Sequence, residues 1–303
     1  MATEVHLSWT LDCEATQRAI DNVELGRRAV RGFVDLVRGA GMRATLFVLP
    51  KDAQGYPQLL RELATEGVEV GLHYHPHEEG HSDPCGAYAA EQQRAMYMLA
   101  SRHFADALEF EPKTFRTGSC SANDATFSVT AELGFTSCSH SMPGRNMTAL
   151  CSNWAGAPEH VHYAHPSNRL LEGGLDLVEV PLTTDPNALN LSKGHVTDLR
   201  VEKLDDLSHR SLLNKTLARE RTRSQPIRTI VALSHNVFDY TDPSEAKFQM
   251  LRKIMAAVVE LADQHEITLR HATISDIAAA YRRATVEPTN ALPTVESSWG
   301  HLS

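Results

Sequence analysis

The sequence contains no long apolar run and no leader-like start. None of its 303 residues lies in a stretch approaching the roughly 20 apolar residues that a membrane-spanning helix needs. The first residues, MATEVHLSWTLDCE, lack the basic and then apolar segments of a secretion signal. We therefore expect no insertion into a membrane and a cytoplasmic location.

Paired cysteines and an excess of positive charge are also absent. The five cysteines are odd in number, scattered, and form no Cys-x-x-Cys pair. In a chain of this size that pattern predicts reduced thiols rather than a disulfide framework. The formal net charge of −9 argues against nucleic acid or an anionic membrane as the main partner.

Strand-like apolar runs alternate with amphipathic helical segments. In one such segment Val30, Phe33, Val34 and Val37 recur at helical spacing and form a single apolar face. Strands are predicted at residues 4–11, 44–49, 68–72, 114–116, 136–139, 175–182 and 229–234. Helices are predicted at residues 23–38, 57–66, 87–108, 124–133 and 245–265, with a last strand and helix in 268–284. This alternation predicts an α/β fold with a mainly parallel sheet, open or closed into a barrel.

No convincing linker or internal repeat interrupts the pattern, so we expect a single catalytic domain over residues 1–285 and a polar tail over 286–303. Residues 140–168 depart from the rhythm and contain His160, His162 and His165. This segment is too long for a plain connection, which favours a functional loop or lid.

Reactive side chains follow four of the predicted strands. In parallel α/β folds ligands bind at the carboxyl ends of the strands. The residues at these ends should therefore meet at one rim; they are Asp12, Glu14, His73, His75, His77, Arg116, Ser119 and His235.

This set of residue types suits metal-assisted hydrolysis. His73 and His77 with one carboxylate would form a two-histidine, one-acid metal site with positions left open for water. A second carboxylate could accept a proton from that water, and a separate imidazole could protonate a leaving amine. Asp12, Glu14 and His235 fit these needs.

The motifs TLDCE, HYHPH, FRTG and LSH, in this order, resemble those of the polysaccharide deacetylase superfamily, carbohydrate esterase family 4. The resemblance covers roughly residues 4–280. It implies a distorted, seven-stranded (β/α) barrel in one domain, and an enzyme that removes acyl groups from N-acylated sugars with one divalent metal ion.

The resemblance also implies roles for residues. Asp12 matches the general base, and Glu14 matches the metal-binding acid in the Asp-x-Glu form, with Cys13 as the alternative ligand. The family's His-x-x-x-His metal pair falls on His73 and His77.

Arg116 matches the arginine that orients the base, and His235 matches the general acid. The family's Arg-Pro-Pro-Tyr-Gly becomes Arg-Thr-Gly-Ser-Cys here, so the oxyanion donor would be the backbone N–H of Ser119. Asp185 lies in the region of a further family motif and is a candidate for substrate contact.

The central histidine of HYHPH has two interpretations. An extended strand would place His73, His75 and His77 on one face. The family pair implies instead that the backbone turns, which Pro76 favours. We then expect His75 to lie aside as a structural or outer residue.

The function predicted from these residues is a metal-dependent hydrolase that removes an N-acyl group, most simply acetyl, from an amino sugar or sugar-like small molecule. The histidine and carboxylate ligands suit zinc first, with cobalt, iron or manganese as alternatives. One alternative function is hydrolysis of a cyclic amide or an N-formyl group on the same scaffold. Another is a non-catalytic protein that binds carbohydrate or metal. A homo-oligomer is compatible with the sequence.

Overall fold

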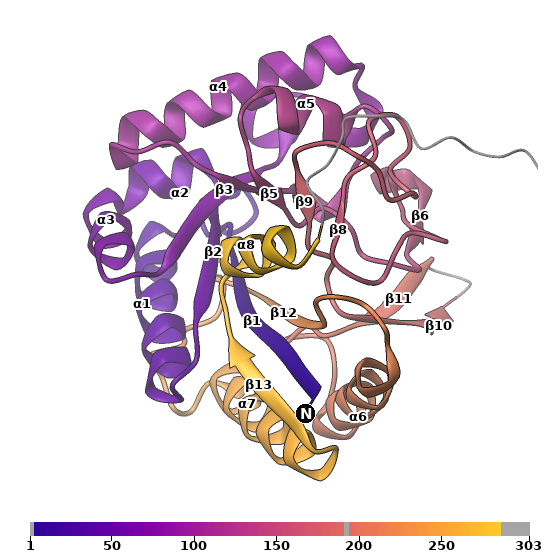
Figure 1. Ribbon diagram of the computed structural model, residues 1–303. Helices are drawn as coiled ribbons and strands as arrows, with labels where there is room; N and C mark the ends of the chain where they lie inside the picture. Colours follow the sequence, from indigo (N-terminus) through magenta and orange to yellow (C-terminus); the bar gives the residue numbers. More distant parts are fainter. Residues whose placement is uncertain (1–2, 191–193, 286–303) are drawn as a thin grey trace, which may run out of the picture.

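A curved, mostly parallel sheet forms the centre of the protein (Figure 1). The computed structural model describes residues 3–190 and 194–285, so the predicted tail over 286–303 lies outside the described residues. Along the sheet the strands are β12 (Thr229–His235), β1 (Thr3–Cys13), β2 (Ala44–Val48), β3 (Glu69–Tyr74), β4 (Thr114–Thr117), β5 (Ser137–Cys138), β9 (Val178–Glu179) and β8 (His162–Tyr163). Strand β13 (Ile267–His271) also pairs with β1, and the β8–β9 pair is antiparallel.

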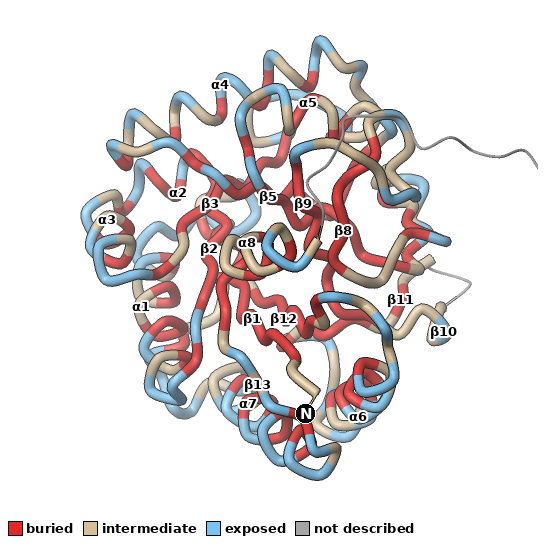
Figure 2. The backbone as a smooth tube through the Cα atoms, in the orientation of Figure 1, coloured by how far each residue is buried: buried red, intermediate tan, exposed pale blue. Residues whose placement is uncertain are grey.

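Helices surround this sheet, with buried faces inward and exposed faces outward (Figure 2). They are α1 (Val23–Gly39), α2 (Pro50–Gly55), α3 (Pro57–Thr65), α4 (Ala90–Leu108), α5 (Thr126–Glu132), α6 (Asp206–Thr222), α7 (Ala246–Gln264) and α8 (Ile274–Ala284). Two short hairpins, β6 (Asn146–Met147) with β7 (Ser152–Asn153) and β10 (Thr184–Asn190) with β11 (His195–Asp198), lie apart from the main sheet. The predicted single-domain α/β fold, a curled and distorted barrel, is confirmed.

Strand β1 is buried over nearly its whole length. Because side chains alternate along a strand, Thr10 and Asp12 share one face while Leu11 points to the other. The guanidinium of Arg116 contacts both Thr10 and Asp12, which places this face toward the interior of the curved sheet. The alternation thus carries a carboxylate to the interior end of a buried strand.

The opposite end of the sheet is closed by α8, which lies across it in Figure 1. The Glu69 carboxylate, at the start of β3, accepts hydrogen bonds from the hydroxyls of Thr45 (2.7 Å) and Thr114 (2.6 Å) and from the backbone N–H of Ser275 (3.2 Å). These bonds join the starts of three strands to the start of α8. The carboxyl ends of the strands remain available for a site. In the described part of the chain, no helix combines the length and apolar character needed to cross a membrane.

Candidate active site

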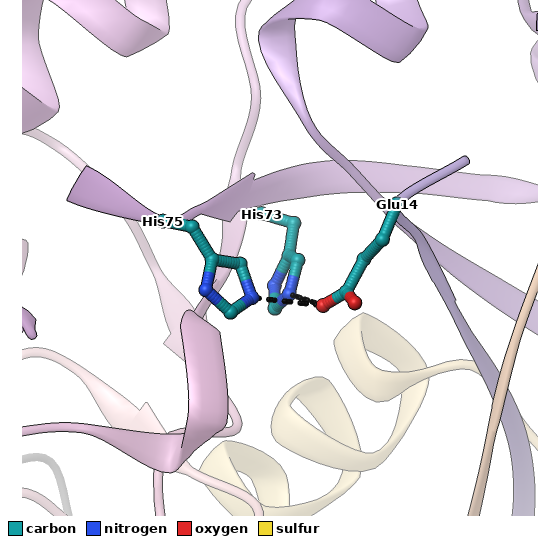
Figure 3. A group of neighbouring side chains, drawn as sticks. All are labelled: Glu14, His73 and His75. Carbon is teal, nitrogen blue, oxygen red and sulfur yellow. Dashed lines mark hydrogen bonds and ion pairs between the residues drawn. The ribbon is translucent and has the colours of Figure 1, made fainter. Parts of the chain in front are cut away.

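A carboxylate and two imidazoles converge at the ends of β1 and β3 (Figure 3). One oxygen of Glu14, Oε1, lies 2.8 Å from Nε2 of His73 and 2.8 Å from Nε2 of His75. The three side chains offer ligand atoms that all lie within 4.8 Å of one another. The structure therefore brings Glu14 and His73 together, as the sequence predicts, and adds His75.

His75 takes this place because the strand conformation continues further than the family pattern implied. The backbone of His75 is still extended, at φ −120° and ψ 118°, and the 3-10 helix η1 (Pro76–Glu79) begins only at the next residue. His73 and His75 are two positions apart on extended backbone, so they share a face.

The structure places the third histidine of the motif, His77, apart from the other two. The turn at Pro76 carries His77 away from Glu14, and the His77 side chain is 51% exposed with Nε2 3.0 Å from Glu78 Oε1. His77 still lines the neighbouring cavity but is not among the three groups that converge.

The orientation of His73 suits a metal ligand. Its Nδ1–H donates to the backbone carbonyl of Arg116 at 2.8 Å, which leaves Nε2 with a lone pair in the neutral ring. That lone pair faces a carboxylate oxygen of Glu14, so a proton or a cation is needed between them. Burial opposes protonation of His73, but the carboxylates of Asp12 and Glu14 outweigh it and raise the pKa of His73. The donor set, one acid and two imidazoles, fits a divalent transition metal.

Asp12 is held by a buried ion pair. Arg116, which is fully buried, donates from Nη1 to Asp12 Oδ1 at 2.7 Å. It also donates from Nε to the Ser139 carbonyl at 3.1 Å and from Nη2 to the Ser139 hydroxyl at 2.9 Å, so its plane is fixed on both sides. The other carboxylate oxygen, Asp12 Oδ2, lies 3.9 Å from His73 Nε2 and borders the cavity. Arg116 therefore stands where the resemblance implied, beside the candidate base.

His235 lies directly beside Asp12, because these two residues are register partners in β12 and β1. Its Nδ1 makes an ion-pair hydrogen bond with Glu202. Burial opposes protonation of His235, but the Glu202 carboxylate outweighs it and raises the pKa of His235 to about 8. Sequence reasoning missed Glu202, which belongs to no motif and follows the β10–β11 hairpin.

A buried polar network behind Glu14 positions the end of β1. The Asn236 side chain accepts from the Glu14 backbone N–H at 2.6 Å. Its amide donates to Asp52 at 3.1 Å and to the Tyr56 hydroxyl at 2.9 Å. Asn236 follows the LSH motif directly, and that position was the only signal in the sequence for this network.

The Cys13 thiol does not compete with Glu14 as a ligand. Its side chain is fully buried in the hydrophobic core, with Sγ 3.8 Å from the Leu11 carbonyl. Burial raises the pKa of Cys13 well above its usual value, which keeps the thiol protonated. Of the two acids and the thiol at this strand end, Glu14 is the one that faces both histidines.

A second group, Asp12 with Glu14 and His235, also has ligand atoms within 4.8 Å of one another. Two of its members already have charged partners, since Asp12 binds Arg116 and His235 binds Glu202. A cation there would stand close to the Arg116 guanidinium. The group of Glu14, His73 and His75 is therefore the better candidate metal site.

The site opens into a cavity of about 520 Å³. Ser119 and Cys120 on its wall adopt left-handed backbone angles, with φ of 57° and 52°, which are uncommon for residues other than glycine. The Ser119 carbonyl accepts a hydrogen bond from Arg145 at 3.0 Å. The structure thus places Ser119 at the cavity, as the sequence predicts.

Asp185 is not brought to this cavity. It lies in β10, where its carboxylate accepts from Lys215 of α6 at 2.8 Å. It borders a separate hollow between the β10–β11 hairpin and α6. The hairpin carries Asp185 away from the strand ends, which the sequence pattern did not indicate.

The segment 140–168 contributes to the site through residues other than its histidines. His160 pairs with Glu172 at 2.7 Å, and His162 is buried in β8. The cavity wall receives Arg145, Ala149 and Leu150 from this segment. Arg145, rather than the histidines, is therefore the charged residue that this segment brings to the cavity.

Comparison with known proteins identifies one matching family and several similar folds. Residues 20–138 match the family model described as polysaccharide deacetylase. No curated protein is similar enough to match the chain. Two solved structures of proteins assigned as polysaccharide deacetylases have the same fold. The one from Mycobacterium smegmatis has a TM-score of 0.64 at 16% identity, covering 97% of this chain and 96% of that chain. The one from Pseudomonas aeruginosa PAO1 has a TM-score of 0.61 at 15% identity, covering 93% and 92%.

The structure of an enzyme named Puue allantoinase is also similar, with a TM-score of 0.62 at 16% identity, covering 93% of this chain and 91% of that one. At these identities the solved structures establish the fold alone. The matched segment contains the strands that carry the two histidines and Arg116. Residues 20–138 are thus similar to the polysaccharide deacetylase family, and the fold of the chain agrees with this similarity.

Proposed function

We propose that the protein is a metal-dependent amide hydrolase that removes an acyl group, most simply acetyl, from the nitrogen of an amino sugar or sugar-like small molecule. The observation that carries the proposal is the convergence of His73 and His75 on one oxygen of Glu14, with Asp12 and His235 beside them at the same cavity. The similarity of residues 20–138 to polysaccharide deacetylases supports hydrolysis of an acyl–nitrogen bond.

Glu14, His73 and His75 would hold the metal ion. We assign the second imidazole to His75 rather than His77 because only His75 reaches Glu14. Zinc suits this donor set best, with cobalt, iron or manganese as alternatives. A bound divalent metal supplies Lewis acidity, which polarises a substrate carbonyl and makes water a nucleophile near neutral pH.

Asp12 is the candidate general base. Its Oδ1 is engaged by Arg116, so Oδ2 is the oxygen available to accept a proton from the attacking water. Arg116 fixes the carboxylate plane, since its other N–H groups are anchored to Ser139. Asp12 is therefore held in one orientation before substrate arrives.

His235 is the candidate general acid. Glu202 holds Nδ1–H and favours the protonated ring, which leaves Nε2–H to be donated to the departing amine. The backbone N–H of Ser119 is the candidate donor to the developing oxyanion. Its left-handed turn lies on the cavity wall.

The test is acetate release from a panel of N-acetylated amino sugars by the zinc-loaded protein, beside the Asp12→Asn variant. We expect acetate release by the native protein and a loss of about 10²–10⁴-fold in Asp12→Asn, the usual value of general base catalysis. Elemental analysis should show that the variant retains zinc. Full activity in Asp12→Asn with zinc bound would contradict the assignment of the base.

A second candidate function is hydrolysis of a cyclic amide or an N-formyl group. The loss of both prolines and the tyrosine from the Arg-Pro-Pro-Tyr-Gly motif supports this alternative, as does the fold shared with an allantoinase. Product analysis separates the candidates, because ring opening releases neither acetate nor formate, and deformylation releases formate. A protein that only binds sugar would bind the panel and turn over none of these compounds.

A further inference from the structure

Two arginines line the cavity beside the candidate catalytic groups. Arg145 comes from the segment 140–168, and Arg200 from the turn that follows β11. The proposed mechanism uses neither of them. Both are largely buried, and Arg145 is only 5% exposed. Buried guanidinium groups are costly unless they are paired with a negative charge, so their partners decide what they do.

Arg145 makes no ion pair with any carboxylate in the parts of the chain that the structure describes. Its two hydrogen bonds go to neutral acceptors, the Ser119 carbonyl at 3.0 Å and the Met147 sulfur at 3.1 Å. Burial and then the neighbouring charge of Arg200 lower the pKa of Arg145. The hydrogen bond to Ser119 satisfies one N–H group of Arg145, but a neutral carbonyl does not offset the positive charge of the side chain.

Arg200 is only partly paired. Its Nη2 lies 3.3 Å from Asp198 Oδ2, while its Nε is buried with no hydrogen-bond partner among the described residues. Backbone bonds between Leu199, Val201 and Leu233 fix this turn alongside β12. Arg200 is thereby held beside the strand that carries His235.

The acids at the cavity do not satisfy this pair of cations. Asp12 is neutralised by Arg116, and Glu14 faces the two histidines. Asp83 lies on the exposed rim with its carboxylate bonded to Ser82. Of the two arginines at the cavity, Arg200 forms an ion pair with Asp198 and also lies near Glu202, whereas Arg145 forms no ion pair among the described residues.

We propose that Arg145 and Arg200 bind an oxyanion of the substrate, a carboxylate or a phosphate, so that the hydrolase acts on anionic N-acylated compounds. The planar fork of arginine matches the geometry of both oxyanions and can bind either through two hydrogen bonds. Because an acetyl group carries no charge, the anion belongs to the amine-bearing part of the substrate. The assignment of a substrate class rests on the function proposed above.

Binding of products that cannot be hydrolysed tests this directly. Calorimetry with the zinc-loaded full chain would compare glucosamine 6-phosphate, muramic acid and glucosamine. We expect at least one anionic compound to bind about tenfold or more tightly than glucosamine, since a hydrogen bond between charged groups contributes that much. The phosphate and carboxylate arms show which oxyanion is preferred.

Variants of the two arginines test which residues cause the preference for the anionic compound. Arg145→Gln and Arg200→Gln should each reduce the preference about tenfold and leave glucosamine binding unchanged, while Arg145→Lys should keep part of it. Arg94→Gln, which changes an exposed arginine on α4 paired with Glu132, is the matched control and should change nothing. A variant that misfolds would lose glucosamine binding as well, so a loss confined to the anionic compound reports the charge.

Two results would overturn the inference. One is equal affinity for the three compounds. The other is a preference for the anionic compound that survives in the double variant of Arg145 and Arg200, because the zinc would then be its cause. The outcome is separable from that of the proposed function. If no acylated compound is hydrolysed but the arginine-dependent preference is measured, the hydrolase proposal fails and the anion site stands. If acetate is released but the three products bind with equal affinity, the anion site fails and the hydrolase proposal stands.

Discussion

The imidazole of His75 packs directly against Gly118, at the point where any other residue would carry a side chain. A Cβ added at Gly118 would overlap several atoms of the ring. His75 therefore reaches Glu14 only because position 118 is glycine, and the turn after β4 sets the geometry of a ligand that comes from β3.

Substitution of Gly118 should act on the metal. We predict that Gly118→Ala displaces His75 and weakens zinc binding roughly 10- to 100-fold, the usual effect of disturbing a ligand's support. Calorimetric titration of the metal-free protein with zinc measures this. Gly39→Ala is the matched control, because a Cβ at Gly39 meets nothing within 4 Å. Equal zinc affinity in both variants would mean that His75 is not a ligand.

A pair of alanine variants should distinguish the two imidazoles that follow His73. His75 contacts Glu14, whereas His77 is half exposed and pairs with Glu78. We expect His75→Ala to lose zinc affinity by more than about a hundredfold, beyond the 10- to 100-fold loss that a change outside the ligands gives. His77→Ala should retain zinc. Loss of the metal in His77→Ala alone would restore the spacing that the family pattern implied.

The pH dependence of turnover should depend on Glu202. The Glu202 carboxylate raises the pKa of His235 from 6.5 to about 8 against the effect of burial. Because the pKa is raised, the ion pair of protonated His235 with Glu202 stabilises the fold fully below pH 6.5, and this stabilisation is lost as the pH rises through about 8. Since the proposed acid must carry its proton, activity should fall on the alkaline side of this range.

Glu202→Gln removes the charge but keeps a hydrogen-bond acceptor. We predict that the alkaline limb of the kcat profile moves to lower pH, and that the titration of His235 followed by NMR moves with it. Glu78→Gln, beside the half-exposed His77, should leave the limb in place. If the limb stayed fixed while the His235 titration moved, another group would be the acid.

Most residues at the strand ends could be predicted from the sequence, because their placement depends only on the order of the strands and the positions of the apolar runs. Asp12, Ser119 and His235 lie at one cavity for that reason, with Arg116 buried behind Asp12. His75 lies closer to Glu14 than the sequence predicted, because the choice between strand and turn at Pro76 is a matter of one residue, which neither periodicity nor proline settles.

The remaining misses have a different cause. The buried face of helix α6 is interrupted by His209, Thr216 and Glu220, so its sequence, DLSHRSLLNKTLARERT, has no continuous apolar stripe. Glu202 and Arg200 precede α6, and Asp185 lies on the hairpin that packs near it. Their positions depend on how these peripheral elements pack on the sheet, which local spacing does not encode.

Acid stability should depend on a buried histidine outside the candidate metal site. His140 is fully buried against Phe115 and Phe127, and its Nδ1 accepts from the Thr117 backbone N–H at 3.0 Å, so the ring is neutral. Burial lowers the pKa of His140 from 6.5 to about 4. In this range the unfolded chain binds a proton that the folded chain does not, so stability is complete above pH 6.5 and falls as the pH drops toward about 4.

Protonation of His140 should lower the free energy of unfolding by on the order of 3 kcal/mol. This is the shift in pKa multiplied by about 1.4 kcal/mol for each pH unit. His140→Gln should be less stable than the native protein at pH 7, because it disturbs the packing and the bond to Thr117. Its unfolding free energy should nevertheless fall less steeply between pH 6.5 and pH 4. Urea unfolding across this range measures both slopes. His265→Gln, at the exposed end of α7, is the control and should keep the native slope. Parallel slopes in the native protein and His140→Gln would show that His140 takes up its proton without unfolding the chain.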